Sequence, residues 1–536
     1  MKHFSCRKIA ICLLLTAMLL PGCKKKEEAP PAPAPEAAAP APLSRSVEMD
    51  TSASMPERQP DSPADYNTEG YDRVSDNPFQ DTLQNPLSTF SIDVDTASYA
   101  NVRRFINSGS LPPPDAVRIE EMINYFDYKY PQPKGDDPFS FTTELTDAPW
   151  RSGNKLLLIG LQGVKVPMDK LPPANLVFLI DVSGSMEDEN KLPLLVSSLK
   201  LLVRKLRSVD RVAIVVYAGQ AGLVLPSTRG DKKQEIRAAL DSLSAGGSTA
   251  GGEGIELAYK IAKKNFISGG NNRVILATDG DFNVGASSDA AMERLIEEKR
   301  KDGVFLSILG FGMGNYKDSK MQKLADKGNG NYAYIDSFEE ANKVLGTQFG
   351  GTLMTIAKDV KMQVEFNPAK VKSYRLIGYE KRMLRREDFV DDKKDAGELG
   401  SGHSVTALYE IVPATGESSD TRELTYQSVR VKENARKSAE LATIRFRYKK
   451  PDGKKSIELV RKIPSTAVSL DKAGENIRFA AAVAEWGMLL RNSEHRGKAS
   501  RSQVLELARN ARGDDDHGYR AEFIELVGMT KKLGKK

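Results

Sequence analysis

NLVFLIDVSGSM, residues 175–186, places a short apolar run directly before a charged residue. Five consecutive apolar residues directly precede Asp181, and Ser183 and Ser185 follow it at alternate positions. An apolar run this short, bounded by a polar turn, is typical of a strand that is buried on both faces. A carboxylate at the buried end of a strand costs free energy unless another group compensates its charge. The segment therefore predicts a buried strand that carries a cluster of polar side chains at its tip.

The chain around this strand alternates between strands and helices. Further Val/Ile/Leu-rich runs occupy 211–219, 273–280 and 304–312, and helical segments separate them. Apolar residues of the first helix recur at the spacing of one buried face, at Leu192, Leu195, Val196, Leu199, Leu202, Val203 and Leu206. Residues 174–350 are therefore predicted to form an α/β domain with a doubly wound, mainly parallel sheet.

Oxygen-bearing side chains follow three segments of this predicted sheet. Asp181, Ser183 and Ser185 follow the first strand, Thr249 lies in the loop AGGSTAGGEG, and Asp279 ends RVILATDG. Ligand sites in open parallel sheets form at the carboxyl ends of the strands, so we expect these residues to meet. Two carboxylates and three hydroxyls suit Mg²⁺ or Mn²⁺ and offer nothing to softer metals.

These residues resemble a known site. DVSGS, Thr249 in GGSTAGG, and TDG are similar to the metal-ion-dependent adhesion site (MIDAS) of von Willebrand factor type A (VWA) domains. The resemblance implies that Ser183 and Ser185 bind the metal directly and that Thr249 does so in one state. It also implies that Asp181 and Asp279 act largely through bound waters. Because Mg²⁺ usually keeps exchangeable waters, an open position is expected for an Asp or Glu of a partner protein.

The N-terminus, MKHFSCRKIAICLLLTAMLLPGC, has a basic start and an apolar run too short for a membrane span. LPGC resembles the lipobox of bacterial lipoproteins, which implies acylation of Cys23; the alternative is an ordinary secretory leader that happens to contain a cysteine. The other two cysteines, Cys6 and Cys12, lie in the leader, so no disulfide is expected in the folded body. Lys24 after Cys23 resembles the sorting signal for the outer membrane. The anchored protein is then expected to face the periplasm or the cell surface.

Composition divides the rest of the chain. We expect a signal peptide at 1–22, a disordered Pro/Ala-rich tether at 23–77, an N-terminal α+β module at 78–170, a β-rich domain at 355–465 and a helical region at 470–536. The N-terminal strands could instead pack on the next domain. Sequence blocks such as STFSIDVDTASYANVRRFI and GYRAEFIELV extend the resemblance to bacterial lipoproteins that carry a VWA domain with extra N-terminal and C-terminal regions.

The overall charge argues against nucleic acid as a partner. The chain has a formal charge of +6, and removal of the leader with Lys2, Arg7 and Lys8 leaves about +3. We expect contact with the membrane through a lipid anchor only.

An enzyme is the main alternative. FSIDVDTAS places Asp93 and Asp95 in a pattern similar to the nucleophile motif of haloacid-dehalogenase-type phosphatases, but Ala97 occupies its fifth position. The simpler interpretation is that Asp95 or Thr96 caps the following helix. The whole chain has only four histidines, and no cysteine lies in the folded body, so no Ser/His/Asp or Cys/His arrangement is expected. We therefore predict no catalytic residues.

Two further motifs have simple explanations. The RGD tripeptide at 512–514 and His517 beside the acidic residues 514–516 could suggest an adhesion motif or a weak metal site. Both lie just before a predicted helix, whose N-terminus favours acidic residues.

The sequence as a whole favours a lipid-anchored envelope protein whose VWA domain recognises another protein through a divalent metal. A structural scaffold whose metal only stabilises the fold remains the third alternative.

Overall fold

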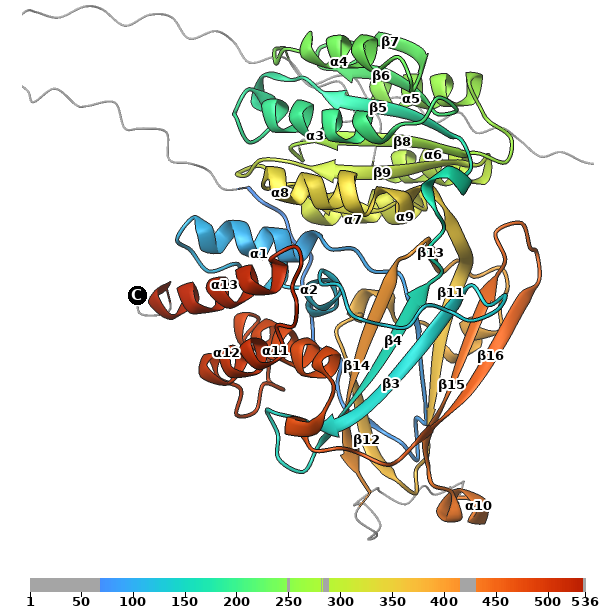
Figure 1. The fold of residues 1–536 in the computed structure, drawn as a ribbon, viewed down its shortest axis with the longest axis vertical. Coiled ribbons are helices and arrows are strands. Elements are labelled where there is room, and N and C mark those ends of the chain that lie inside the picture. The colour runs from blue at the N-terminus through green and yellow to red at the C-terminus, as the bar shows by residue number, and fades with distance from the viewer. Residues whose placement is uncertain (1–67, 248–250, 281, 283–288, 415–429, 534–536) are drawn as a thin grey trace, which may run out of the picture. The chain divides into compact units, whose positions relative to one another are not determined.

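The computed structural model of the 536-residue chain describes residues 68–247, 251–280, 282, 289–414 and 430–533. Figure 1 shows a sheet flanked by helices, further strands beyond it, and helices from both ends of the chain. No helix in the described part is long and apolar enough to cross a membrane.

The six-stranded sheet has the order β10-β9-β8-β5-β6-β7. Its strands are β5 (Ala174–Asp181), β6 (Arg211–Tyr217), β7 (Ala221–Arg229), β8 (Asn271–Thr278), β9 (Val304–Gly310) and β10 (Tyr332–Tyr334). All neighbours pair in parallel except β6 and β7, which are antiparallel. The predicted doubly wound, mainly parallel α/β fold is confirmed.

Helices cover both faces of this sheet. One face packs on α3 (Leu192–Lys205), α4 (Lys233–Asp241), α8 (Phe338–Ala341) and η4 (Asn342–Thr347). The opposite face packs on α5 (Gly251–Lys264), α6 (Asp289–Lys301) and α7 (Asp318–Lys327). Alternate residues of β5 enter the two cores, Phe178 on one side and Leu179 on the other. Burial of both faces explains why the strand is continuously apolar.

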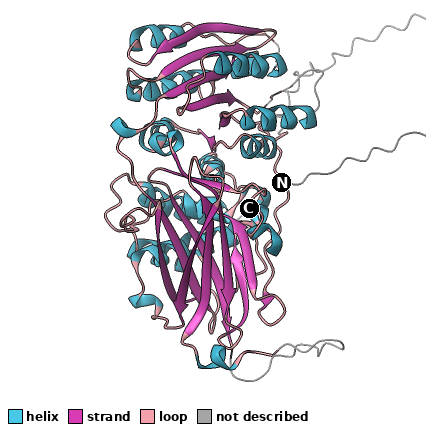
Figure 2. Cartoon of the chain, turned by 90° about the vertical axis from the view of Figure 1, so that its right-hand side faces the viewer, coloured by secondary structure: helices cyan, strands magenta, loops and turns pink. Residues whose placement is uncertain are grey.

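Two more sheets pack face to face in the remainder of the chain (Figure 2). The first has the order β1-β12-β14-β4-β3, with β1 (Gln80–Asp81), β3 (Phe139–Asp147), β4 (Lys155–Gly163), β12 (Val371–Ile377) and β14 (Ser404–Pro413). The second has the order β13-β11-β15-β16, with β11 (Thr355–Phe366), β13 (Gly397–Gly400), β15 (Glu440–Lys449) and β16 (Ser456–Pro464). β2 (Leu87–Ser91) also pairs with β11.

This sandwich is made by both ends of the chain. β4 pairs with β14 in an antiparallel ladder, so that Leu158 lies opposite Leu408. Residues 78–170 are therefore not a separate module, and residues 355–465 are not an independent β domain. The predicted β-rich C-terminal region and helical tail are confirmed, but the β-rich region is not separate from the N-terminal one, because hydrogen bonds between their strands run through the middle of one sheet. The alternative, that the N-terminal strands pack on the next domain, is wrong as well, because β1, β2 and β4 pair with β12, β11 and β14 of the later β-rich region and not with strands of residues 174–350.

A helical layer covers the outer face of the first sheet. It combines α1 (Ala97–Asn107) and α2 (Ile119–Asn124) with α11 (Glu475–Leu490), α12 (Arg501–Asn510) and α13 (Tyr519–Leu533). Leu156 and Leu158 of β4 enter this core, whereas Leu157 and Ile159 enter the core of the sandwich. The C-terminal helices are thus part of a layer that begins near the N-terminus.

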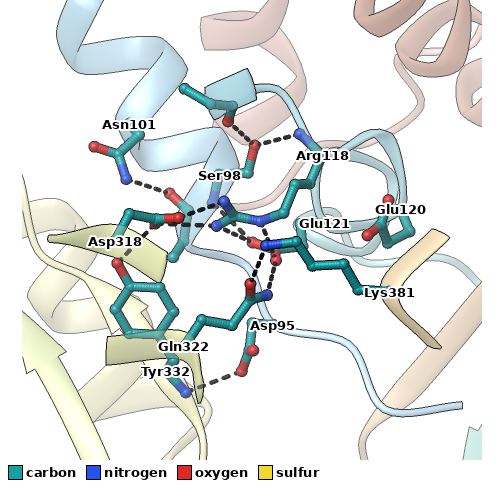
Figure 3. A network of polar contacts seen from close by, with 12 residues as sticks. Asp95, Ser98, Asn101, Arg118, Glu120, Glu121, Asp318, Gln322, Tyr332 and Lys381 are labelled. Atoms are coloured by element: carbon teal, nitrogen blue, oxygen red, sulfur yellow. Dashed lines mark hydrogen bonds and ion pairs between the residues drawn. The ribbon is translucent and has the colours of Figure 1, made fainter. Parts of the chain in front are cut away.

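A buried polar network joins this helical layer to the six-stranded sheet (Figure 3). The guanidinium of Arg118, at the start of α2, pairs with Asp318 of α7 and with Glu121. Asp318 also accepts a hydrogen bond from the hydroxyl of Tyr332 at 2.8 Å, and Gln322 donates to Glu121 at 3.0 Å. Because these charges are buried in contact with one another, the two regions form one unit.

Residues 68–77, which the sequence assigns to the tether, contact the folded body. Glu69 forms two hydrogen bonds of 2.8 Å with the guanidinium of Arg104, and Asp76 accepts from Arg491 at 2.6 Å. The expected tether therefore ends earlier than residue 77. The expected signal peptide at 1–22 and residues 23–67 of the expected tether lie outside the described residues.

Candidate functional site

Asp181 is the last residue of β5 and is fully buried. Its Oδ1 accepts a hydrogen bond from the backbone N–H of Ser183 at 2.9 Å. Its Oδ2 accepts from the hydroxyl of Tyr217 at 3.0 Å and from that of Thr278 at 3.3 Å. Residues from three neighbouring strand ends thus compensate the burial of this carboxylate and fix its orientation.

The serines lie in the turn that follows. The hydroxyl oxygens of Ser183 and Ser185 are 3.0 Å apart, with Ser183 buried and Ser185 exposed. Gly184 donates its N–H to the carbonyl of Gly247 at 3.1 Å. The turn is therefore held against the loop that leads to Thr249, which itself lies outside the described residues.

Asp279 directly follows β8 and is also fully buried. Its Oδ2 accepts from the ammonium of Lys191 at 3.2 Å and from the side-chain amide of Asn315 at 3.5 Å. Gly280 has a φ of +103°, and a Cβ there would lie 2.6 Å from the backbone nitrogen of Lys317. Only glycine permits the chain to turn this closely beside the loop of residues 311–317.

The structure brings four of the five predicted residues to the carboxyl edge of the sheet. Thr278, next to Asp279, hydrogen-bonds to Asp181, and Lys191 joins Asp279 to the turn through the carbonyl oxygen of Ser185 at 2.7 Å. Burial raises the pKa of Asp181 above its usual range, and the negative charge of Asp279 adds to this increase. A cation beside these carboxylates would favour their ionised forms.

The donor set fits a small, hard cation. It offers two carboxylates and two hydroxyls, all oxygen, at an edge where Ser185 is reachable from solvent. Among the described residues no group of three or more His, Cys, Asp or Glu side chains is arranged to hold a metal. A metal here would therefore depend on the serine hydroxyls and on water as well as on the carboxylates.

Several residues of this site are missing from the sequence prediction. Tyr217 and Thr278 end neighbouring strands, so their place beside Asp181 follows from the same strand-end reasoning. Lys191 directly precedes α3, and Asn315 lies in the 311–317 loop between β9 and α7. No local pattern marks these last two, because their contacts depend on how loops far apart in sequence meet.

The N-terminal segment stabilises the 311–317 loop. The backbone N–H of Thr68 donates to the carbonyl of Gly314 at 2.7 Å, and Gly70 donates to Tyr316 at 2.9 Å. The N–H of Gly314 in turn donates to the carboxylate of Glu69 at 3.0 Å. This segment therefore anchors the loop that carries Asn315.

Asp93 and Asp95, the residues of the phosphatase alternative, have other partners. Together with Asp326 they surround the guanidinium of Arg382, at 2.9, 3.3 and 2.8 Å. Asp95 also accepts from the backbone N–H of Tyr332 at 2.9 Å (Figure 3). The pKa of Asp326 is raised to about 6 by burial. These aspartates line a cavity of about 1120 Å³, and their contacts give both a structural role.

The predicted helix cap at this place is wrong. Thr96 is the N-cap of α1, yet it makes no side-chain capping hydrogen bond, and Asp95 points to Tyr332. The backbone N–H of Ser98 in the first turn is satisfied by the distant carboxylate of Glu121 at 2.9 Å. A tertiary contact thus replaces the local cap.

The acidic turn before α13 behaves as predicted. Asp515 accepts from the backbone N–H groups of Arg520 and Ala521 at 3.0 and 2.8 Å, at the start of the helix. Asp514, the last residue of the RGD tripeptide, pairs with Lys129 at 2.7 Å. The prediction that these acids serve the helix N-terminus is confirmed for Asp515.

Models of three protein families match different parts of the chain. The family model "von Willebrand factor type A domain" matches residues 175–347, "von Willebrand factor" matches 65–158, and "Uncharacterized protein YfbK, C-terminal" matches 351–533. Among solved structures, similarity is found to a von Willebrand factor type A protein from Catenulispora acidiphila, with TM-score 0.41 and 15% identity over 74% of this chain and 91% of that chain. The ArnB paralog VWA2 from Sulfolobus acidocaldarius has TM-score 0.37 and 15% identity over 74% and 98%.

Two relatives are similar in sequence. A protein of Synechocystis, described as "Uncharacterized protein sll0103", is 28% identical over 176 residues, which cover 32% of this chain and 40% of the relative. "Uncharacterized protein YfbK" of Escherichia coli (strain K12) is 48% identical over 474 residues, which cover 87% of this chain and 82% of the relative. The chain therefore belongs to the YfbK family, and residues 175–347 are its von Willebrand factor type A domain.

Proposed function

We propose that this chain is a lipid-anchored protein of the bacterial cell envelope whose VWA domain binds Mg²⁺ or Mn²⁺ and recognises a partner protein through that ion. The observation that supports the proposal is the meeting of Asp181, Ser183, Ser185 and Asp279 at one edge of the sheet. Type A domains typically mediate metal-dependent contacts between proteins, and the residues of this site suit that role.

The two serines and the two aspartates would contribute to metal binding in different ways. Ser183 and Ser185 would offer their hydroxyls directly, because they lie in the turn with Ser185 exposed. Asp181 and Asp279 are buried, and their two negative charges would balance a divalent ion. When bound, the metal supplies an electrophilic centre on which a carboxylate of the partner can dock. A protein that presents an exposed Asp or Glu is therefore the proposed partner.

The anchor is proposed from the leader sequence. Cys23 would carry the lipid and hold the chain at the outer membrane, facing the periplasm or the cell surface; it lies outside the described residues. Cys23→Ser is expected to release the full-length protein from the membrane fraction and to abolish incorporation of labelled palmitate. Continued palmitate labelling of Cys23→Ser would contradict this assignment.

Metal binding can be tested on the body from residue 68 to the C-terminus. Mn²⁺ titration followed by electron paramagnetic resonance should show one bound ion in the wild type and none in Ser183→Ala or Asp279→Asn. Ser242→Ala is a suitable control, because this serine lies in an exposed position at the end of α4. Wild-type protein that binds no Mn²⁺ would overturn the proposal.

The adhesion role needs a second measurement. The immobilised wild-type body (residues 68 to the C-terminus) should capture a reproducible set of envelope proteins in Mg²⁺. It should release them in EDTA, and the Ser183→Ala variant should not capture them. Chemical amidation of carboxylates on the captured proteins should also release them. Capture that continues unchanged in EDTA would favour the structural scaffold.

A further inference from the structure

The ammonium group of Lys191 lies within the candidate metal site. Its Nζ is 2.7 Å from the carbonyl oxygen of Ser185, 3.2 Å from Oδ2 of Asp279 and 3.4 Å from Oδ2 of Asp188. The side chain of Lys191 is only 8% exposed. A positive charge is therefore in place at the point where two of the proposed metal-binding residues meet.

The position of this lysine is built into the surrounding backbone. Gly312 has a φ of +71°, and a Cβ at this residue would lie 2.8 Å from Cγ of Lys191 and would also collide with Cε. The backbone N–H of Lys191 donates to the carbonyl of Asp188 at 2.9 Å, directly before α3. The lysine stem thus fits a space that exists because residue 312 is glycine.

The charges of the site explain why a cation is needed there. Asp279 is fully buried, and an ionised buried carboxylate is costly unless an opposite charge accompanies it. Lys191 supplies that charge from within the chain. A divalent ion that shares the carboxylate of Asp279 would lie close to the ammonium, and the two positive charges would repel each other.

We propose that Lys191 is an internal counter-ion of this site, which neutralises Asp279 when no metal is bound and withdraws when a divalent ion enters. The inference rests on the proposed metal-binding function and goes beyond it by naming the residue that sets the affinity. Asp188 provides the alternative partner, because it already lies 3.4 Å from the ammonium and its side chain is 72% exposed. Each metal ion must therefore compete with a cation that the chain supplies itself.

The first test measures affinity for Mn²⁺ in the wild type, Lys191→Met and Lys191→Gln. Both variants remove the charge and keep a similar length, and glutamine also keeps a donor for the carbonyl of Ser185. Loss of a positive charge at this distance should tighten Mn²⁺ binding by at least about tenfold in both. Lys200→Met is the matched control, since Lys200 lies on α3 and pairs with Asp241; its affinity should equal that of the wild type.

The second test follows the lysine itself in the wild-type protein. A short pulse of acetic anhydride, read by peptide mass spectrometry, should label Lys191 several-fold more in saturating Mg²⁺ than in EDTA, because withdrawal exposes the amine. Labelling of Lys200 should not change.

The outcomes separate the two proposals. Mn²⁺ affinity that is unchanged or weaker in both Lys191 variants, or an amine that stays protected in Mg²⁺, overturns the counter-ion role while metal binding stands. Absence of Mn²⁺ binding in the wild type and in both variants overturns the metal site and the counter-ion together. Unfolding midpoints of the variants in EDTA, compared with wild type, show whether each variant is folded. If Lys191→Met is not folded, the Mn²⁺ affinity of Lys191→Gln and the labelling of the wild-type protein test the counter-ion role.

Discussion

Arg118 and Asp318 form a bidentate ion pair from which water is excluded. Nη1 of Arg118 is 2.6 Å from Oδ2 of Asp318, and Nη2 is 3.1 Å from Oδ1. The two side chains are 2% and 0% exposed. Arg118 is the N-cap residue of α2 in the helical layer, and Asp318 is the first residue of α7 on the VWA sheet. The pair therefore joins parts of the chain 200 residues apart (Figure 3).

Arg118→Met should destabilise the protein by about 3–5 kcal/mol, because it leaves the buried carboxylates of Asp318 and Glu121 without their cation. Denaturant unfolding followed by circular dichroism measures the loss. The double variant Arg118→Met/Asp318→Leu should recover part of it. Arg385→Met, at a side chain that is 74% exposed, should cost less than about 1 kcal/mol. A loss of less than about 1 kcal/mol in Arg118→Met would show that the ion pair does not stabilise the contact between the two regions.

Divalent metal should stabilise the VWA domain. At a Mg²⁺ concentration one hundred times the dissociation constant, binding adds about 2.7 kcal/mol to the free energy of unfolding. Thermal unfolding should therefore shift upward by a few degrees in Mg²⁺ and return in EDTA. Asp279→Asn should show no metal-dependent shift. An equal shift in this variant would mean that Mg²⁺ acts elsewhere on the protein.

Glu485 predicts a pH dependence of stability. This α11 residue is fully buried, and its Oε1 accepts from the backbone N–H of Ser500 at 2.9 Å. Burial raises the pKa of its carboxyl from 4.5 to about 7. Between these two values the folded state holds more protons than the unfolded state, so the free energy of unfolding contributed by this group falls as the pH rises.

Glu485→Gln should remove this cost. The variant should be more stable than wild type at pH 8, by up to about 3 kcal/mol, and similar to it at pH 4. Urea unfolding at both pH values measures the difference. Glu506→Gln, at an exposed position on α12, is the control and should change neither value. A Glu485→Gln variant that is less stable at pH 8 would show that the carboxylate is stabilising in its ionised form.

Half of the sandwich should not be stable without the other half. A fragment of residues 351–536 lacks β3 and β4 and leaves the edge of β14 unpaired, so it should aggregate when expressed alone. Co-expression with residues 68–170 should give a soluble complex that elutes as one peak in size-exclusion chromatography.

Variants of the N-terminal fragment make this test specific. Leu158→Asp places a charge at a fully buried position of β4 and should prevent co-elution, whereas Ser152→Asp in the exposed turn should not. A soluble, monomeric fragment 351–536 would show that the C-terminal half folds independently.

The sequence was sufficient to predict the VWA sheet and the place of Asp181, Ser183, Ser185 and Asp279. Both depend on local signals, because strand periodicity identifies the sheet and the carboxyl ends of parallel strands lie at one edge. No such signal exists for the pairing of β4 with β14. Their register is a relation between segments about 240 residues apart, and apolar alternation alone does not specify which strands are neighbours.

The prediction from composition also placed the end of the expected tether too far along the chain. Residues 68–77 are polar, which favours an extended linker. Their order comes from individual contacts, such as the pairs of Glu69 with Arg104 and Asp76 with Arg491. Lys191 was missed for the same reason, since its role depends on a glycine more than one hundred positions later.

The insertion of the VWA domain between β4 and its partner has a consequence for biosynthesis. β4 leaves the ribosome with apolar side chains on both faces, and β14 emerges only after about 240 further residues. At typical translation speeds this delay is roughly 10–50 s. In the described part of the chain the VWA strands pair with one another, so that domain can fold during this interval, while the apolar faces of the nascent N-terminal strands remain uncovered. A chaperone that shields residues 139–163 during this interval would therefore set the yield of correctly folded protein.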